Sequence, residues 1–221
     1  MNNLHHFYHI YSGGMWENPT KGHIKALKDS DLISNLTTFN VGIVGPPNTR
    51  KEVKKYLDSQ DINYNVCTEV NNGWEQETQD KLYEFSQEND GYILYAHTKN
   101  AYNLNQLHVA WRLSMTYHTV IIWRDVVKHL DEGFSAVGSH YLHGGNGEVE
   151  TVSGFFAGTF WWTHLKYIKN FPQKASRKNR FGAEGWIGFL KPTVESMGEV
   201  CKIYDYVPYH PIDPTRMVTF W

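Results

Sequence analysis

The sequence has 221 residues, of which 41% are hydrophobic and 20% are charged, and this balance excludes a chain that is disordered throughout. The formal net charge of −2 excludes a protein that coats nucleic acid by overall positive charge, but a local basic patch remains compatible with it. No segment approaches the roughly 18 apolar residues of a membrane span, and the first residues lack a signal-peptide pattern. We therefore expect a cytoplasmic protein, in the host cytoplasm if a phage encodes it, without a membrane partner.

The first hundred residues alternate between predicted strands and helices. Four apolar, β-prone runs predict strands at residues 7–11, 41–45, 63–70 and 91–96. The segments between them predict a short helix or turn at 30–36 and helices at 50–59 and 74–87. Asn48 or Thr49 is the expected N-cap of the helix at 50–59. This alternation favours a parallel sheet with helices on its faces, in which ligands bind beyond the carboxyl ends of the strands.

The second half is less regular and differs in charge. A helical pattern covers residues 104–117, a short apolar run covers 120–123, and a further helix is predicted near 125–130. Residues 134–142 are strand-like, 144–147 form a turn or loop, and the tail 206–221 is expected to be extended. Residues 151–183 contain no acid, and they hold six cations: Lys166, Lys169, Lys174, Arg177, Lys178 and Arg180.

Two of the predicted strands end in polar clusters that suit a phosphate-bearing ligand. Ser12, Gly13 and Gly14 follow the first strand, where glycines either let backbone approach a diphosphate or form a plain turn. His97, Thr98 and Lys99 end the strand at 91–96; they either hold a pyrophosphate and stabilise a departing nucleotide or form a solvated strand end. Neither glycine pattern has the spacing of a dinucleotide fingerprint or a P-loop.

Further along the chain, two segments are candidates for the other part of a site. Residues 154–162 combine small residues with aromatic ones, as expected of a cleft lining or of a buried strand. Glu184 follows the acid-free stretch and has apolar neighbours, which favours a general base; the alternative is an acid at a helix N-terminus.

Residue types that bind metals give no consistent pattern. Cys67 and Cys201 are the two cysteines, and their separation predicts buried thiols, not a disulfide or a zinc site. The twelve histidines show no zinc-hydrolase spacing. The letters Asp-x-Asp occur at Asp29 and Asp31, but there they precede a predicted helix instead of ending a strand. We predict no metal ligands, and dependence on a divalent metal is left open.

With these motifs in view, the sequence resembles a group of small bacterial and phage glycosyltransferases of GT-A-like architecture. The matching elements are residues 9–11, 95–99, Trp111 with Arg112 and Met115, 158–162, and Arg180 with 183–186, so the resemblance extends over about residues 7–190. Asn100 and Thr159 depart from the pattern, which has Gly and Asn there.

The resemblance implies one domain over 1–221, with a Rossmann-type, mostly parallel sheet, a nucleotide-sugar half at about 1–100 and an acceptor half at about 101–221. It implies a UDP-sugar as the donor substrate, with no other cofactor firmly predicted. The implied catalytic residues are Glu184, His97 and Lys99. The implied donor-binding residues are His9, Tyr11, Ser12, Gly13, Gly14, Thr98 and Arg112. The implied acceptor-binding residues are Trp161, Trp162, Lys174, Arg177, Lys178, Arg180 and Trp186.

The acceptor is argued from the basic stretch and its aromatic neighbours. Cations on one loop could track a phosphate backbone, and Trp161, Trp162 and Phe181 could hold an extruded base. The leading hypothesis is a phage enzyme that adds arabinose or glucose to hydroxymethylcytosine in DNA. A cell-surface or other glycan acceptor is the alternative, and a non-catalytic carbohydrate- or nucleic-acid-binding module is the second alternative.

Overall fold

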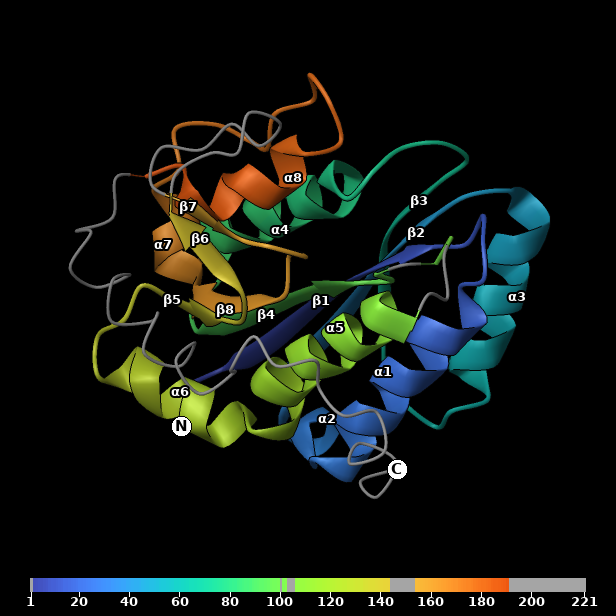
Figure 1. Cartoon of the computed structure of the whole chain (residues 1–221), viewed down its shortest axis with the longest axis horizontal. Coiled ribbons are helices and arrows are strands. Elements are labelled where there is room, and N and C mark those ends of the chain that lie inside the picture. Colours follow the sequence, from blue (N-terminus) through green and yellow to red (C-terminus); the bar gives the residue numbers. More distant parts are fainter. Residues whose placement is uncertain (1, 100, 103–105, 144–153, 191–221) are drawn as a thin grey trace.

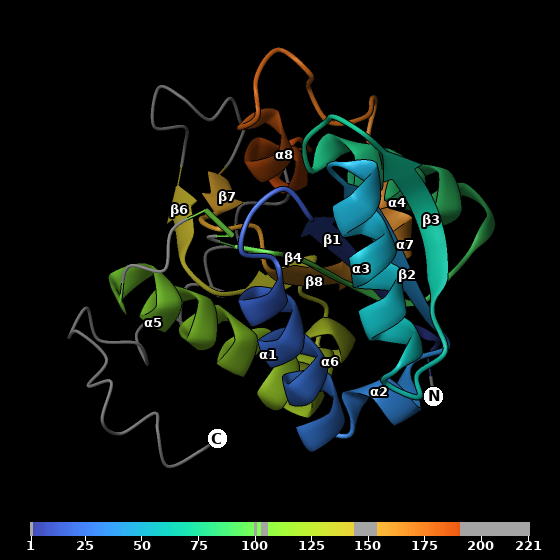
Figure 2. The ribbon, with the colours of Figure 1, turned by 90° about the vertical axis from the view of Figure 1, so that its right-hand side faces the viewer.

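A six-stranded sheet forms the centre of the molecule and separates two layers of helices (Figures 1 and 2). The computed structural model describes residues 2–99, 101–102, 106–143 and 154–190. Within them the strand order of this sheet is β3-β2-β1-β4-β8-β5. The strands are β1 (Leu4–Tyr11), β2 (Thr38–Val44), β3 (Asn65–Val70), β4 (Tyr92–His97), β5 (Ala136–Gly138) and β8 (Trp161–His164). A separate antiparallel pair consists of β6 (Tyr141–His143) and β7 (Gly154–Phe156).

The strands from the first half of the chain run parallel, and those from the second half make the sheet mixed. β1 pairs in parallel with both β2 and β4, and β2 pairs in parallel with β3. β8 is antiparallel to β4 and to β5. The prediction of a mostly parallel α/β sheet flanked by helices is therefore confirmed, while the GT-A-like assignment stays a prediction.

The helices cover both faces of the sheet. They are α1 (Glu17–Asp29), α2 (Leu32–Asn35), α3 (Pro47–Asp58), α4 (Gln76–Glu88), α5 (Gln106–Thr116), α6 (Trp123–Asp131), α7 (Leu165–Lys169) and α8 (Gly182–Gly185). Helices α1, α5 and α6 lie on one face, and α4, α7 and α8 lie on the other (Figure 2).

Alternation along β1 shows how one strand serves both layers. Tyr8 stacks on His23 of α1, with ring centroids 4.2 Å apart, whereas His9 bonds Thr78 of α4. Successive side chains of a strand point to opposite faces. A strand with helices on both faces is therefore buried along nearly its whole length, as Leu4–Ile10 are here.

Two segments were predicted wrongly. Helix α1 was missed, because His23 and Gly22 interrupt an apolar face that otherwise rests on Ile24 and Leu27. As a result, Asp29 ends α1 and does not begin a helix. Helix α3 begins at Pro47 and not at Arg50, and its N-cap is Pro46 and not Asn48 or Thr49. Proline suits the first turn of a helix, because the N–H that it lacks would have no partner there.

The segment after α5 also differs from its pattern. The apolar run at 120–123 contributes to a π-helix, η1 (Tyr117–Ile121), and to the start of α6. The strand-like run at 134–142 is divided into β5 and β6, with His140 at a φ of 60° between them. The predicted turn at 144–147, the tail at 206–221 and Cys201 lie outside the described residues. Cys67 is half-buried and its thiol is free. No helix of the described part has the length and hydrophobicity to cross a bilayer.

Candidate functional site

The polar ends of β1 and β4 lie side by side, as expected for neighbouring parallel strands. His9 pairs with His97 in the sheet register. Beyond this pair, the backbone N–H of Tyr11 donates to Thr98 Oγ1 at 2.8 Å, and the N–H of Thr98 donates to the carbonyl of His9 at 2.9 Å. The predicted donor-binding residues of these two strand ends therefore meet at one edge of the sheet.

The loop after β1 is held tightly against the loop after β4. The backbone N–H of Met15 donates to the carbonyl of Ala101 at 2.6 Å, and a Cβ on Gly14 would lie 2.5 Å from that same oxygen. Gly14 therefore permits the close approach of the two loops. Ser12 is fully buried, and its hydroxyl bonds the carbonyl of Val44 and the hydroxyl of Thr49. Its side chain joins the loop to β2 and α3.

A cluster of ionisable side chains lies beside these loops, on the α4 face of the sheet. Glu75, which precedes α4, lies with Oε1 3.3 Å from His97 Nδ1 and accepts a hydrogen bond from Tyr95 at 3.3 Å. The other ring nitrogen of His97, Nε2, lies 2.9 Å from the carbonyl oxygen of Gly158. Glu184 of α8 is close enough to act electrostatically on Glu75.

Burial sets the protonation of this cluster. Burial, followed by the nearby charge of Glu184, raises the pKa of Glu75 to about 8, although Lys99 opposes the shift. Burial and the charge of Lys99 hold the pKa of His97 well below its usual value. Neutral His97 must donate from Nε2 to the Gly158 carbonyl, so its Nδ1 is an acceptor. Near neutral pH, Glu75 is therefore the protonated member of the pair, with its Oε1 3.3 Å from this acceptor nitrogen.

Lys99 and three aromatic rings complete the edge. The ammonium nitrogen of Lys99 lies 4.3 Å from the centroid of the Trp111 ring, a cation–π contact. The rings of Tyr11 and Tyr102 lie 4.8 Å apart, and Tyr102 is 70% exposed. An exposed ring beside a cation suits a ligand that carries both a base and phosphates.

Several predicted site residues are buried in the core. His9 is buried and bonds Thr78 Oγ1 at 2.8 Å. Trp161 and Trp162 are 0% exposed, and Trp186 is 1% exposed. Trp161 stacks on Tyr95, and Trp162 donates its ring N–H to the carbonyl of Thr119 at 2.7 Å. These three tryptophans expose no face on which an extruded base could stack.

The predicted acceptor cations divide into two groups. Lys174 pairs with Glu84 at 2.8 Å, and Arg177 pairs with Glu77 and Asp80, all three acids on α4. Lys178 and Arg180 are exposed, and the Arg180 guanidinium lies over the ring of Phe181. Part of the acid-free stretch is therefore basic because it docks on an acidic helix.

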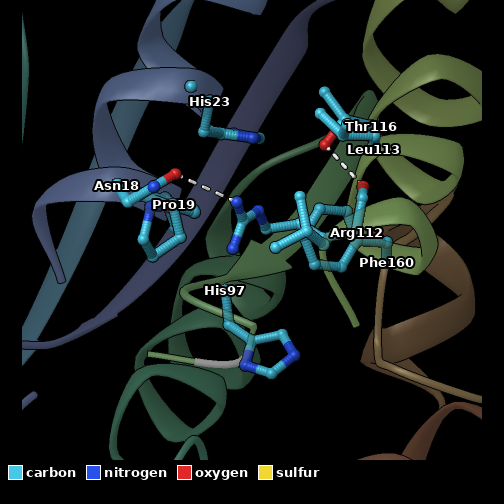
Figure 3. Close-up of a pocket in the computed structure, with 11 residues that line it drawn as sticks. Asn18, Pro19, His23, His97, Arg112, Leu113, Thr116 and Phe160 are labelled. Carbon is cyan, nitrogen blue, oxygen red and sulfur yellow. Dashed lines mark hydrogen bonds between the residues drawn. The ribbon is translucent and has the colours of Figure 1, made fainter. Parts of the chain in front are cut away.

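Arg112 lies on the α1 side of the sheet, and the cavity that it lines is also bordered by His97 of the Glu75 cluster. Arg112 projects from α5 toward α1 and lines this cavity of about 220 Å³ (Figure 3). Its guanidinium donates to Asn18 Oδ1 at 3.1 Å and to the backbone carbonyl of Lys99 at 3.3 Å. The Arg112 side chain therefore connects α5, α1 and the end of β4.

Comparison with known proteins identifies no family. No protein-family model matches the sequence, and no curated protein matches it. Among solved structures, the chain is similar to 4-diphosphocytidyl-2C-methyl-D-erythritol synthase from Anaerococcus prevotii. The TM-score is 0.42 and the identity 8%, over 92% of this chain and 96% of that one. The function must be argued from the site itself.

Sequence reasoning missed Glu75 and Tyr102. Both follow carboxyl ends of strands: Glu75 comes after β3, and Tyr102 comes after β4. An acid in the first turn of the helix predicted at 74–87, after a strand of the same sheet, was the signal available for Glu75. In the described residues, no group of three or more His, Cys, Asp or Glu side chains is arranged to hold a metal ion.

Proposed function

We propose that this protein is a glycosyltransferase that uses a nucleotide-sugar donor. One observation carries the proposal. The loops after β1 and β4 meet at the carboxyl edge of the sheet, beside Lys99 and the cluster of Glu75, His97 and Glu184. This edge combines a tight glycine loop, a cation and two carboxyl groups, and such groups suit the binding of a diphosphate and the transfer of a proton.

In the proposed reaction the bond between the anomeric carbon and the diphosphate oxygen breaks, and a bond to an acceptor oxygen forms. Lys99 offsets the charge that develops on the departing diphosphate. The base of the donor stacks on Tyr102. Glu184 accepts the proton of the acceptor hydroxyl. In this proposal Glu75 keeps its proton beside Glu184, because two adjacent carboxyl groups disfavour double ionisation.

Two acceptors are proposed with equal weight: hydroxymethylcytosine in DNA, and a glycan. The DNA proposal rests on exposed cations such as Arg180. The ion pairs of Lys174 and Arg177 with α4 remove two of the four cations, and the burial of the tryptophans removes the base platform. These observations give the glycan acceptor equal weight.

A donor screen tests the proposal. The protein is incubated with UDP-sugars, including UDP-glucose and UDP-arabinose, together with DNA that contains hydroxymethylcytosine or with a set of oligosaccharides. Release of UDP and a mass gain of one hexose or pentose in either acceptor would support the proposal and identify the acceptor. Binding of a donor that remains intact with every acceptor would contradict it and favour a binding module.

A further inference from the structure

A buried arginine faces a cavity on the α1 and α5 side of the sheet. Arg112 is 7% exposed, and burial lowers its pKa. Its intrinsic pKa is about 12.5 or higher, so it stays charged at neutral pH. A buried charge is costly unless it is paired and hydrogen-bonded.

Arg112 is only partly satisfied by its neighbours. A guanidinium has five N–H donors, and among the described residues this one makes two hydrogen bonds, to Asn18 and to the carbonyl of Lys99, both neutral acceptors. Within the described part of the chain, no carboxylate forms an ion pair with Arg112. Tyr8 lies nearby and is neutral, because burial raises its pKa above the usual value.

The cavity beside Arg112 is mostly apolar elsewhere. Its walls include Pro19, Leu113 and Phe160, and Figure 3 shows these side chains around the guanidinium. A volume of about 220 Å³ exceeds that of a single water molecule and falls below that of a typical drug-sized ligand site. The space therefore suits a small ligand with one anionic end.

We propose that this cavity binds a small organic anion whose carboxylate or phosphate group pairs with Arg112 and whose apolar part lies against Pro19, Leu113 and Phe160. A planar guanidinium binds either oxyanion with two parallel hydrogen bonds. The anion supplies the negative partner that the described residues around Arg112 lack. His97 also lines this cavity, so the cavity adjoins the Glu75 cluster, but binding of a free anion at Arg112 does not require sugar transfer.

Calorimetric titration with simple probes tests the cavity. Benzoate and phenyl phosphate represent the two oxyanions, and benzyl alcohol is the neutral match. We expect saturable binding of at least one anion, about tenfold or more weaker binding of benzyl alcohol, and a similar loss for Arg112→Gln. The control is Arg124→Gln, which removes an exposed arginine of α6 and leaves affinity unchanged.

A second variant keeps the test decisive if Arg112→Gln fails to fold. Gly22 of α1 lines the cavity, and a Cβ there would meet no heavy atom within 4 Å. Gly22→Phe therefore adds a large side chain in open space beside the cavity without removing Arg112, and it should weaken anion binding about tenfold or more. No saturable binding of either anion to the wild-type protein would overturn the proposal. Equal affinity in the wild type and in the folded variants would do so too. Neither result depends on donor turnover.

Discussion

The two faces of the sheet bury ionisable groups of opposite type near the same strand end, and they offset the cost of burying them by different means. On the α4 face, Glu75 is surrounded by His97, Tyr95 and a second carboxyl group, and its pKa is raised to about 8. On the α1 face, Arg112 lies against neutral acceptors and a cavity. A carboxyl group escapes the cost of burial by binding a proton, whereas a guanidinium stays charged and needs an anion.

The packing around the two groups differs as well. Tyr95, which donates to Glu75, stacks on fully buried Trp161 at a centroid distance of 5.1 Å. Leu113, beside Arg112, is half-buried and borders the cavity. The carboxyl side is densely packed, and the arginine side leaves room. The two faces therefore differ in what is proposed for them: sugar transfer beside Glu75, and binding of a small anion beside Arg112.

Truncation of one side chain on each face gives the largest expected difference. Trp161→Ala should lower the free energy of unfolding by about 3–5 kcal/mol, because it removes a fully buried ring and leaves a cavity. Leu113→Ala should cost clearly less, because Leu113 is half-buried beside existing space. Urea unfolding of both variants measures the difference. Equal losses would mean that the two faces are packed alike.

The next largest expected effect is a loss of turnover when one of the proposed catalytic charges is removed. Lys99→Met and Glu184→Gln should each reduce sugar transfer by at least about 100-fold, on the scale of a lost charge stabiliser or general base. Initial rates with the donor found in the screen measure this. Lys128→Met and Glu52→Gln change exposed residues of α6 and α3 and serve as controls. Near-normal rates for both site variants, in folded protein, would refute the site assignment.

The protonation of Glu75 should appear in the pH dependence of stability. Its raised pKa means that the folded state holds a proton that the unfolded state releases between about pH 4.5 and 8. Stability therefore falls as pH rises through this interval, by up to about 1.4 kcal/mol per pH unit. In Glu75→Gln this contribution should be absent. Unfolding free energies of both proteins at pH 5, 6, 7 and 8 check the slope, and parallel profiles would show that Glu75 is ionised.

Removal of an exposed cation should change the free energy of unfolding least. Its comparison with the buried residues shows how much burial contributes. Arg177 is about half exposed and pairs with Glu77 and Asp80. Arg177→Ala should lower the free energy of unfolding by less than about 1 kcal/mol, and 1 M salt should reduce the difference further. Thermal unfolding at low and high salt provides the measurement. A larger loss that persists in salt would make this pair part of the core rather than a surface contact.

The sequence predicted the parallel part of the sheet well because its strands are continuous apolar runs. Residues 41–44 of the first run lie in β2 and 92–96 of the second lie in β4, and the polar ends at Ser12–Gly14 and His97–Lys99 meet as expected. Helix α1 escaped detection because His23, a polar residue by type, is buried against Tyr8 and His6. The pattern of residue types does not show that a histidine will be buried by stacking on another ring.

Periodicity and local chemistry by themselves determined the four parallel strands β1 to β4, and neighbouring parallel strands bring their polar ends together by necessity. Only the tertiary structure shows which charged side chains form ion pairs within the fold and which lie at the proposed site. Two cations of the acid-free stretch, Lys174 and Arg177, pair with Glu84 and Glu77 of α4, and only the fold brings these residues together. Glu75 and His97, 22 positions apart in the sequence, become one proton-sharing pair only through folding. Local sequence encodes conformation, whereas the pKa of a side chain depends on the neighbours and the burial that the fold provides.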